Sequence, residues 1–261
     1  MTRRGASLDK VETAFTESSF ESQQRRSSEM KSARSTNQNP KCDLPEAKRI
    51  VIVDDHPLFR KGLEELINSE SSFAVCGEAG NAAEAMEVIR KLNPDLAIVD
   101  LSLPGANGIE LIKNVRAEFS KLPILVLSMH DESLYALRAL RAGAEGYVMK
   151  HEAMANVIHA IHEVFNGRPY LSPAMAAQVI TKFAHRESED ETDAVERLSD
   201  RELEILELIG KGKDVREIAK LLHLSPKTVE THRSHIKDKL DLKNSREVAR
   251  FALQWLSTRG A

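Results

Sequence analysis

Three aspartates stand directly after apolar runs that are typical of buried strands. Asp54 and Asp55 follow the run Ile-Val-Ile-Val, and Asp100 follows the run Leu-Ala-Ile-Val. Carboxylates that crowd together need a cation between them, and their hard oxygen atoms are the ligands that Mg²⁺ prefers. We therefore predict a magnesium site in which Asp55 and Asp100 bind the ion directly, Asp54 acts through water, and the backbone carbonyl of Ser102 is a third ligand.

Two other groups also follow apolar runs, the hydroxyl of Ser128 and the ammonium of Lys150. A divalent cation, an ammonium group and a hydroxyl donor together stabilise a phosphoryl group during in-line transfer. In that setting Asp100 can act as a nucleophile and form an aspartyl-phosphate. One acidic strand end is commonly just the solvated start of a loop, but three aspartates, a serine and a lysine after four apolar runs favour a phosphoryl-transfer site.

Alternating strand and helix patterns position these residues. Short apolar runs predict parallel strands buried on both faces, and apolar residues at helical spacing predict helices between them. The predicted strands are residues 49–53, 73–79, 95–100, 123–128 and 146–149, and the predicted helices are residues 57–68, 81–92, 109–119, 132–142 and 152–165. This alternation predicts a doubly wound α/β fold with right-handed crossovers. With the strand order 2-1-3-4-5, the first and third strands are neighbours, so their aspartates converge at the edge where ligands bind.

The last part of the chain, residues 198–256, predicts four short helices. Each helix start is marked by a cap: two capping boxes, a serine before a proline, and an asparagine before the final helix. These signals are Ser199 with Glu202, Asp214 with Glu217, Ser225-Pro226 and Asn244-Ser245. Residues 215–222 and 226–240 then form a helix, a tight turn and a second helix.

The helix predicted over residues 226–240 has two faces. Val229, Ile236 and Leu240 form an apolar stripe at helical spacing. Another face carries small polar and basic side chains, which suit a helix that reads the major groove of DNA. On this helix we expect Lys227, Glu230, Thr231 and Ser234 on the base-reading face, and Thr228, Arg233, Lys237 and Lys239 at phosphates. A plain helical bundle with a solvated face stays the alternative, because acidic residues dilute the positive charge.

The bulk composition is that of a globular protein with uneven charge. The 261 residues are 41% hydrophobic and 30% charged, and this length suggests two domains. No apolar stretch approaches the ~20 residues that cross a bilayer, and Cys42 and Cys76 give neither a disulfide framework nor metal-ligand spacing. Residues 47–197 are acidic, whereas residues 198–261 carry more basic than acidic side chains, which fits a domain that meets nucleic acid. We expect a reducing, cytoplasmic setting without membrane contact.

These patterns divide the chain into four segments. Residues 1–46 contain too few apolar side chains to offset the entropy of ordering, and they predict a disordered extension. Residues 47–167 predict the α/β domain, residues 168–197 a short helix and a polar linker, and residues 198–261 the small helical domain.

The α/β segment resembles the receiver domain of two-component response regulators over about residues 48–165. The resemblance is carried by Asp54-Asp55-His56-Pro57, Asp100 with Leu103-Pro104-Gly105 and Asn107-Gly108, Ser128, and Gly146-Tyr147 with Lys150. It implies a flavodoxin-like fold, phosphoryl transfer from a sensor histidine kinase to Asp100, and Ser128 with Tyr147 as a switch pair. Leu103 stands where methionine is usual, and His151 where many receivers have proline. Apart from the resemblance, Tyr147 reads equally well as a half-buried aromatic at the sheet edge.

The C-terminal segment resembles the LuxR-type helix-turn-helix over about residues 196–256. The resemblance is carried by Leu198-Ser199-Asp200-Arg201-Glu202, Ile218-Ala219 and residues 225–232. A receiver followed by such a domain is the NarL/FixJ architecture of bacterial transcription regulators, which implies a homodimer on promoter half-sites after phosphorylation. The final helix is where such domains usually dimerise, although its Trp255 has an equal reading as part of the small core.

We therefore expect a response regulator, not an enzyme, in which phosphorylation at Asp100 controls sequence-specific DNA binding and transcription. One alternative is a metal-dependent phosphohydrolase with a covalent aspartyl-phosphate, but Ser102 stands where those enzymes commonly have a second acid. Another is a phosphorylation-independent DNA-binding protein with a vestigial receiver. The complete set of aspartates, Ser128 and Lys150 argues against that alternative.

Overall fold

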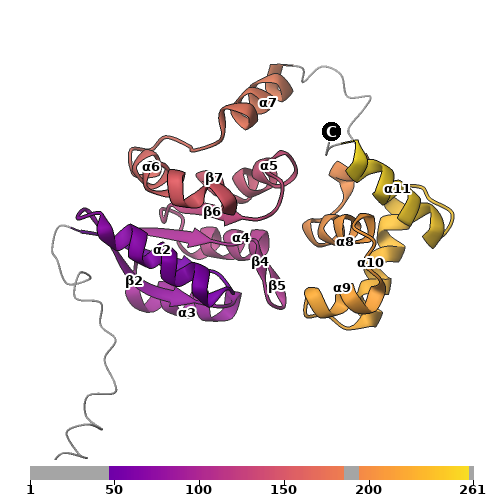
Figure 1. Ribbon diagram of the computed structural model, residues 1–261, viewed down its shortest axis with the longest axis horizontal. Coiled ribbons are helices and arrows are strands. Elements are labelled where there is room, and N and C mark those ends of the chain that lie inside the picture. Colours follow the sequence, from indigo (N-terminus) through magenta and orange to yellow (C-terminus); the bar gives the residue numbers. More distant parts are fainter. Residues whose placement is uncertain (1–46, 185–193, 259–261) are drawn as a thin grey trace, which may run out of the picture. The chain divides into compact units, whose positions relative to one another are not determined.

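The computed structural model describes residues 47–184 and 194–258 (Figure 1). The predicted disordered extension, residues 1–46, and most of the predicted linker, residues 185–193, lie outside the described residues. The residues of the two described ranges belong to one compact unit. Within the described ranges, no helix is long and apolar enough to cross a membrane.

A five-stranded parallel sheet is the centre of the α/β domain. Its strands lie in the order β2-β1-β3-β6-β7, which is the predicted order with β6 and β7 as the fourth and fifth strands. The strands are β1 (Lys48–Val53), β2 (Phe73–Ala79), β3 (Leu96–Val99), β6 (Ile124–Ser128) and β7 (Gly146–Met149). Val53 of β1 pairs with Val99 of β3, so the residues that follow them, Asp54 and Asp100, leave the sheet side by side.

The loop after Asp100 contains a small hairpin that the sequence analysis did not predict. Strands β4 (Ser102–Leu103) and β5 (Ala106–Asn107) pair antiparallel. Between them Gly105 has a φ of 73°, a left-handed conformation that glycine adopts without steric cost. Two-residue strands are too short to show the alternation by which a strand is detected, so this segment was expected only as a loop.

Helices cover both faces of the sheet (Figure 1). The α/β domain contains α2 (Pro57–Ser69), α3 (Ala82–Leu92), α4 (Gly108–Glu118), α5 (Glu132–Ala142) and α6 (Ala153–Phe165). Because side chains alternate along β1, Ile50 and Ile52 pack with α2 and α6, whereas Val51 and Val53 pack with α3, α4 and α5. Both clusters are buried, which explains why each strand is a continuous apolar run.

Two segments beyond β7 differ from the prediction. The helix expected over residues 168–183 is α7 (Pro173–Ala184) and begins later, because the backbone of Tyr170 bonds to β7 and its flank instead. Residues 194–197, expected in the linker, form the 3₁₀ helix η3 (Ala194–Arg197). A further 3₁₀ turn, η1 (Lys150–Glu152), leads from β7 into α6.

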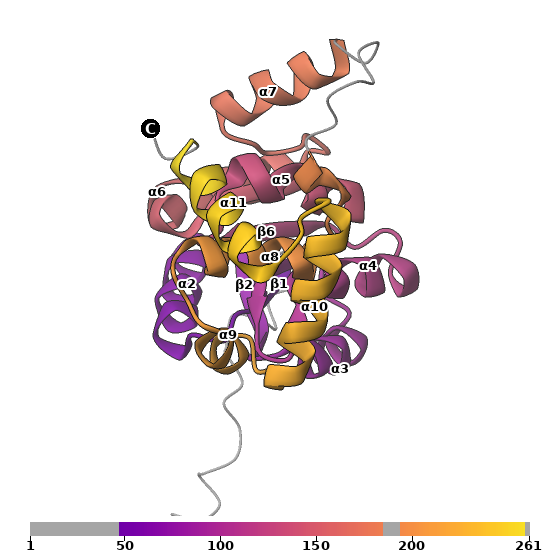
Figure 2. The same cartoon turned by 90° about the vertical axis from the view of Figure 1, so that its right-hand side faces the viewer.

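The four predicted C-terminal helices are confirmed. They are α8 (Asp200–Gly210), α9 (Val215–Leu221), α10 (Pro226–Lys239) and α11 (Ser245–Ser257). Both capping boxes form, at Ser199 and at Asp214. Helix α8 lies behind α10 and α11 in Figure 2 and packs against both. Trp255 is only 7% exposed, so in a single chain it belongs to this core.

The tight loop beside Asp100 gives a test of the fold. A Cβ atom at Gly108 would lie 2.4 Å from the carbonyl oxygen of Asp100 and 2.4 Å from the Cα of Leu101. We expect Gly108→Ala to lower the free energy of unfolding by about 1–3 kcal/mol through overpacking. Urea unfolding followed by circular dichroism measures this change.

The matched control is Gly62→Ala within helix α2. Its Cβ would lie 3.4 Å from the flexible Cε of Met154, so only the helix preference for alanine changes. This variant should be unchanged or more stable by about 0.5–1 kcal/mol. Equal stability of the Gly108→Ala variant and the wild type would contradict the close approach.

Candidate functional site

The three predicted aspartates converge at the carboxyl edge of the sheet. Ligand atoms from Asp54, Asp55, His56 and Asp100 all lie within 4.8 Å of one another. The loop backbone holds two of the carboxylates in place, since the N–H of His56 donates to Asp54 Oδ1 at 2.8 Å and the N–H of Ser102 donates to Asp100 Oδ1 at 3.1 Å. The predicted acidic cluster is therefore present.

Lys150 joins this cluster from the end of β7. Its Nζ lies 2.6 Å from Asp54 Oδ2 and 2.7 Å from Asp100 Oδ2, and all three side chains are buried. Burial raises the pKa of the Asp100 carboxyl, and the charge and hydrogen bond of Lys150 offset this only in part. Burial acts to lower the pKa of Lys150, but the two carboxylates outweigh it and raise that pKa. The ammonium therefore stays charged beside a desolvated carboxylate.

The oxygen atoms of the cluster fit a hard cation. Asp55 Oδ1 is buried and accepts no hydrogen bond. The Nδ1 of His56 lies 2.6 Å from this oxygen, but hydrogen-bond geometry is lacking there, so the contact is a close charge pair only when the imidazole is protonated. An orphaned buried carboxylate oxygen beside two other carboxylates is what a Mg²⁺ ligand set offers. The role of the Ser102 carbonyl as a further ligand stays a prediction.

Ser128 and Tyr147 lie next to this cluster on β6 and β7. Ser128 is fully buried and its Oγ accepts a hydrogen bond from the N–H of His130 at 3.1 Å. The hydroxyl of Tyr147 donates to the carbonyl of His130 at 2.8 Å, and burial raises the pKa of this phenol. Tyr147 is thus buried and not half-buried, and the two predicted switch residues contact the same residue, His130.

The second predicted constellation is a helix-turn-helix. Helix α9 ends at Leu221 and α10 begins after the N-cap Ser225, whose side chain accepts from the N–H of Thr228. In the turn between them His223 adopts a φ of 53°, in the left-handed region. Val229 and Ile236 are fully buried, as the apolar stripe predicts.

The polar side chains of α10 differ in their exposure to solvent and in their partners within the domain. The exposed residues are Lys227, Glu230, Thr231, Ser234, His235, Asp238 and Lys239. Thr228 bonds to the capping serine, and Lys239 donates to Glu202 of α8 at 2.6 Å, so these two predicted phosphate contacts have partners within the domain. Arg233 pairs with Glu230 at 3.2 Å. The contacts of all eight residues with DNA remain predictions.

Glu202, His232 and His235 form another group with metal-ligand atoms, which the sequence analysis did not single out. The carboxylate of Glu202 is already engaged, because it accepts from Lys239 at 2.6 Å and from the Ser199 N–H at 2.7 Å in the capping box. We interpret this group as the ion-pair network that joins α8 to α10.

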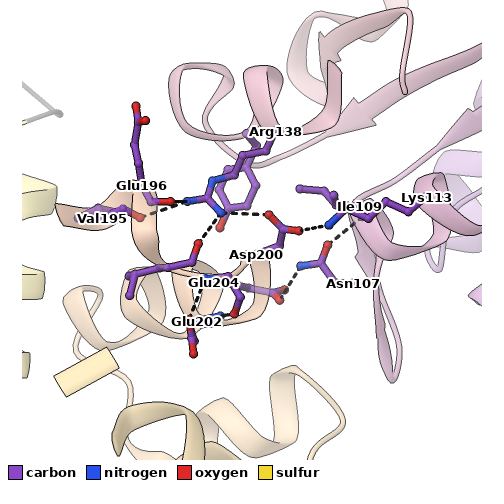
Figure 3. A network of polar contacts seen from close by, with 12 residues as sticks. Asn107, Ile109, Lys113, Arg138, Val195, Glu196, Asp200, Glu202 and Glu204 are labelled. Atoms are coloured by element: carbon purple, nitrogen blue, oxygen red, sulfur yellow. Dashed lines mark hydrogen bonds and ion pairs between the residues drawn. The ribbon is translucent and has the colours of Figure 1, made fainter. Parts of the chain in front are cut away.

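The polar face that α8 presents to the α/β domain was not predicted from the sequence. Arg138 of α5 donates to the carbonyls of Val195, Glu196 and Leu198 and to the carboxylate of Asp200 (Figure 3). Lys113 of α4 also reaches Asp200, at 3.0 Å. Asn107 of β5 contacts Glu204 at 3.5 Å (Figure 3). These bonds hold the start of the DNA-binding domain against helices α4 and α5.

Glu207 extends this face toward the acidic cluster. Its Oε2 accepts from the hydroxyl of Tyr135 at 3.1 Å and lies 3.3 Å from His130 Nδ1, and its Oε1 accepts from Lys211 at 2.5 Å. Burial acts to raise the pKa of Glu207, but His130 and Lys211 outweigh it and lower the pKa to about 2. The spacing of Asp200, Glu204 and Glu207 on one side of α8 was the available signal, although a solvated helix face has the same pattern.

Comparisons with known proteins agree with both constellations. Residues 50–162 match the family model described as response regulator receiver domain, and residues 196–252 match the one described as bacterial regulatory proteins, luxR family. The oxygen regulatory protein NreC of Staphylococcus carnosus is 37% identical over 210 residues, which are 79% of this chain and 97% of that protein. NreC of Staphylococcus haemolyticus is 36% identical over the same shares.

Two solved structures are similar as well. A LuxR-family response regulator from Aurantimonas sp. SI85-9A1 is 38% identical with a TM-score of 0.50, covering 53% of this chain and 99% of that one. RcsB from Salmonella enterica serovar Typhimurium, solved bound to promoter rprA with the phosphomimetic BeF3⁻, is 27% identical with a TM-score of 0.54, covering 79% and 98%. With its two domains in this order and this degree of identity, the chain belongs to the NarL/FixJ-type response regulators, which are transcription regulators controlled by phosphorylation.

Proposed function

We propose that Asp100 accepts a phosphoryl group from a sensor histidine kinase, and that this modification controls sequence-specific DNA binding by α10. The observation that carries the proposal is the buried contact of 2.7 Å between Lys150 and Asp100, beside Asp54 and Asp55. A nucleophilic carboxylate, a fixed ammonium and a set of hard oxygen ligands are the parts that phosphoryl transfer requires.

The transfer forms one bond and breaks one. A carboxylate oxygen of Asp100 attacks phosphorus, and the bond from phosphorus to the donor nitrogen of a phosphohistidine breaks, with its electron pair leaving on the imidazole. Asp54, Asp55 and Asp100 would hold Mg²⁺, which when bound supplies positive charge to the phosphoryl oxygens. Lys150 supplies a second positive charge, and the burial of Asp100, which is only 1% exposed, keeps bulk water from its carboxylate.

Ser128 and Tyr147 suit the role of the switch pair. Once Asp100 carries a phosphoryl group, the hydroxyl of Ser128 is the neighbouring group that can donate to a phosphoryl oxygen. Moving toward that oxygen would draw Ser128 Oγ from the N–H of His130, and Tyr147, which bonds to the carbonyl of His130, would follow. The modification is thus converted into a backbone change at one residue.

DNA is the target of the C-terminal domain in this proposal. Residues Glu230, Thr231 and Ser234 are exposed on α10 and can reach base edges. The relative RcsB was solved on promoter DNA with a phosphomimetic, which supports a link between phosphorylation and DNA binding here. The proposal includes a homodimer, whose two-fold symmetry matches the two half-sites of a palindrome. It also includes a location in the cytoplasm, where the promoter DNA lies.

The two alternatives have weaker support. A phosphohydrolase would be expected to place a second acid near the acceptor, but Ser102 stands at that position and its side chain contacts His130. A phosphorylation-independent regulator would have no use for the buried charges at Asp54, Asp100 and Lys150. Such charges are costly to bury without a function or a precise set of partners.

The acceptor is tested with a small phosphodonor. Acetyl phosphate should label the protein in the presence of Mg²⁺, and chelation of the metal should abolish the label, because the carboxylate cluster repels the incoming phosphate without it. Asp100→Asn should remove the label. Phosphate incorporation is followed with radioactive donor, and labelling that persists in Asp100→Asn would exclude Asp100 as the acceptor.

The role of Lys150 is tested separately from acceptance. Lys150→Ala should keep some Mg²⁺-dependent labelling but lose the gain in DNA affinity that labelling gives, because the ammonium no longer ties the phosphoryl group to β7. The variant should also be less stable without Mg²⁺, by about 3–5 kcal/mol, since two buried carboxylates lose their counter-ion. Lys150→Arg, which keeps the charge, is the control. A full gain in affinity for Lys150→Ala would refute this role.

The two faces of α10 are tested with a duplex selected from random DNA by the full-length phosphorylated protein. Thr231→Ala should cost ~1–3 kcal/mol at particular base pairs of that duplex and leave others unaffected. Lys237→Ala should weaken binding to all sequences alike and lower the salt slope by about one. Binding isotherms on single-base variants decide the assignment, which is wrong if Lys237→Ala alters base preference and Thr231→Ala does not.

A further inference from the structure

Two histidines of α10 face a carboxylate of α8. His232, His235 and Glu202 each offer one ligand atom, and these atoms lie within 4.8 Å of one another. Because they are three residues apart, the histidines share one side of α10, with ring centroids 6.3 Å apart. The side chain of His235 is 56% exposed and that of Glu202 is 4% exposed. The group is therefore anchored at a buried carboxylate and open to solvent at His235.

The ion-pair network between α8 and α10 uses one oxygen of this carboxylate. Lys239 Nζ and the N–H of Ser199 both donate to Glu202 Oε2. Oε1 faces His235, whose Nδ1 lies 3.6 Å away, too far for a hydrogen bond. The Nδ1 of His232 is buried and has no hydrogen-bond partner among the described residues. A carboxylate oxygen and a buried imidazole nitrogen are thus left for a further ligand.

The protonation states of the group suit a metal ion. Burial lowers the pKa of the His232 imidazole, and the charge of Glu202 offsets this only in part. Burial acts to raise the pKa of the Glu202 carboxyl, but the bonds from Lys239 and Ser199 outweigh it and lower that pKa. A neutral imidazole and an ionised carboxylate are the forms that bind metals.

Two imidazoles and one carboxylate form a ligand set typical of zinc, with a fourth position left for water. Mg²⁺ takes oxygen ligands instead, so this group differs in metal preference from the aspartate cluster of the receiver. Ligand atoms lie about 2.0–2.2 Å from a zinc ion. A rotation of the exposed His235 side chain is therefore sufficient to close the set around the ion.

We propose that Glu202, His232 and His235 bind one Zn²⁺ ion. Binding of the ion releases Lys239 from Glu202, so that its ammonium contacts a DNA phosphate. The carboxylate brings one negative charge, whereas Zn²⁺ and Lys239 together bring three positive charges, so the ammonium is repelled. The Lys239 side chain is 40% exposed and has room to turn toward solvent. The zinc site is independent of the proposed function, but the role of Lys239 rests on it.

Zinc binding is measured by calorimetric titration of the full-length protein in excess Mg²⁺, which occupies the carboxylate cluster of the receiver. The wild type should bind one Zn²⁺, and His235→Gln should weaken this binding about tenfold or more, because one ligand is lost. Co²⁺ in place of zinc should give the visible absorption bands of a four-coordinate ion in the wild type but not in His235→Gln.

His159→Gln is the matched control, since His159 is an exposed helix residue of the receiver. It should bind zinc as the wild type does. Equal zinc affinity of His235→Gln and the wild type would place the ion elsewhere and overturn the site, and so would a wild type that binds no zinc.

Release of Lys239 is tested by the salt dependence of binding to the selected duplex, with and without one equivalent of Zn²⁺, using the phosphorylated full-length protein. Zinc should raise the affinity of the wild type and steepen its salt slope by about one, because one more phosphate is neutralised. Neither Lys239→Gln nor His235→Gln should respond. A zinc response that persists in Lys239→Gln, or an unchanged slope in the zinc-bound wild type, would overturn the release. Failure of the zinc-free wild type to bind DNA would instead refute the proposed function.

Discussion

The ammonium group of Lys150, buried between the carboxylates of Asp54 and Asp100, is the interaction on which the site depends. Desolvation of three charges is costly, so they persist only where strands and loops fix them within hydrogen-bond distance of one another. The parallel register of β1 and β3 supplies two of them, and the end of β7 supplies the third. The sheet therefore positions the charged groups of the site, and the helices bury its two apolar faces.

The same ends of strands also organise the rest of the molecule. Ser128 ends β6 and Tyr147 lies within the neighbouring strand β7, and both contact His130, the residue that faces Glu207 of α8. Arg138 and Lys113 hold the start of α8 from α5 and α4. The phosphorylation site thus lies close to the contacts that hold the DNA-binding domain, and only a few residues separate them.

Local patterns in the sequence were sufficient for most of the fold and the acidic site. Buried parallel strands are continuous apolar runs, and with the strand order fixed, the residues after those runs must meet at one edge. Asp54, Asp100 and Lys150 could be placed together for this reason. Caps at Ser199 and Asp214 marked the helix starts of the C-terminal domain in the same way.

Contacts between the domains could not be predicted, because they depend on how two separately folded surfaces meet. Glu207 belongs to an acidic helix face that looks solvated in the sequence, and His130 is a single loop histidine. The hairpin of β4 and β5 was too short to be detected, and the engagement of Lys239 with Glu202 required the packing of α10 on α8.

Control of DNA binding by the modification of Asp100 is tested by measuring the affinity of the full-length protein for its selected DNA duplex with and without beryllofluoride, in the presence of Mg²⁺. Beryllofluoride mimics a phosphoryl group on a carboxylate and needs no kinase. We expect beryllofluoride to increase the affinity of the wild type, and we expect no increase without Mg²⁺ or in Asp100→Asn. The same affinity for the wild type in both conditions, with beryllofluoride shown to be bound, would contradict phosphorylation-controlled DNA binding through this site.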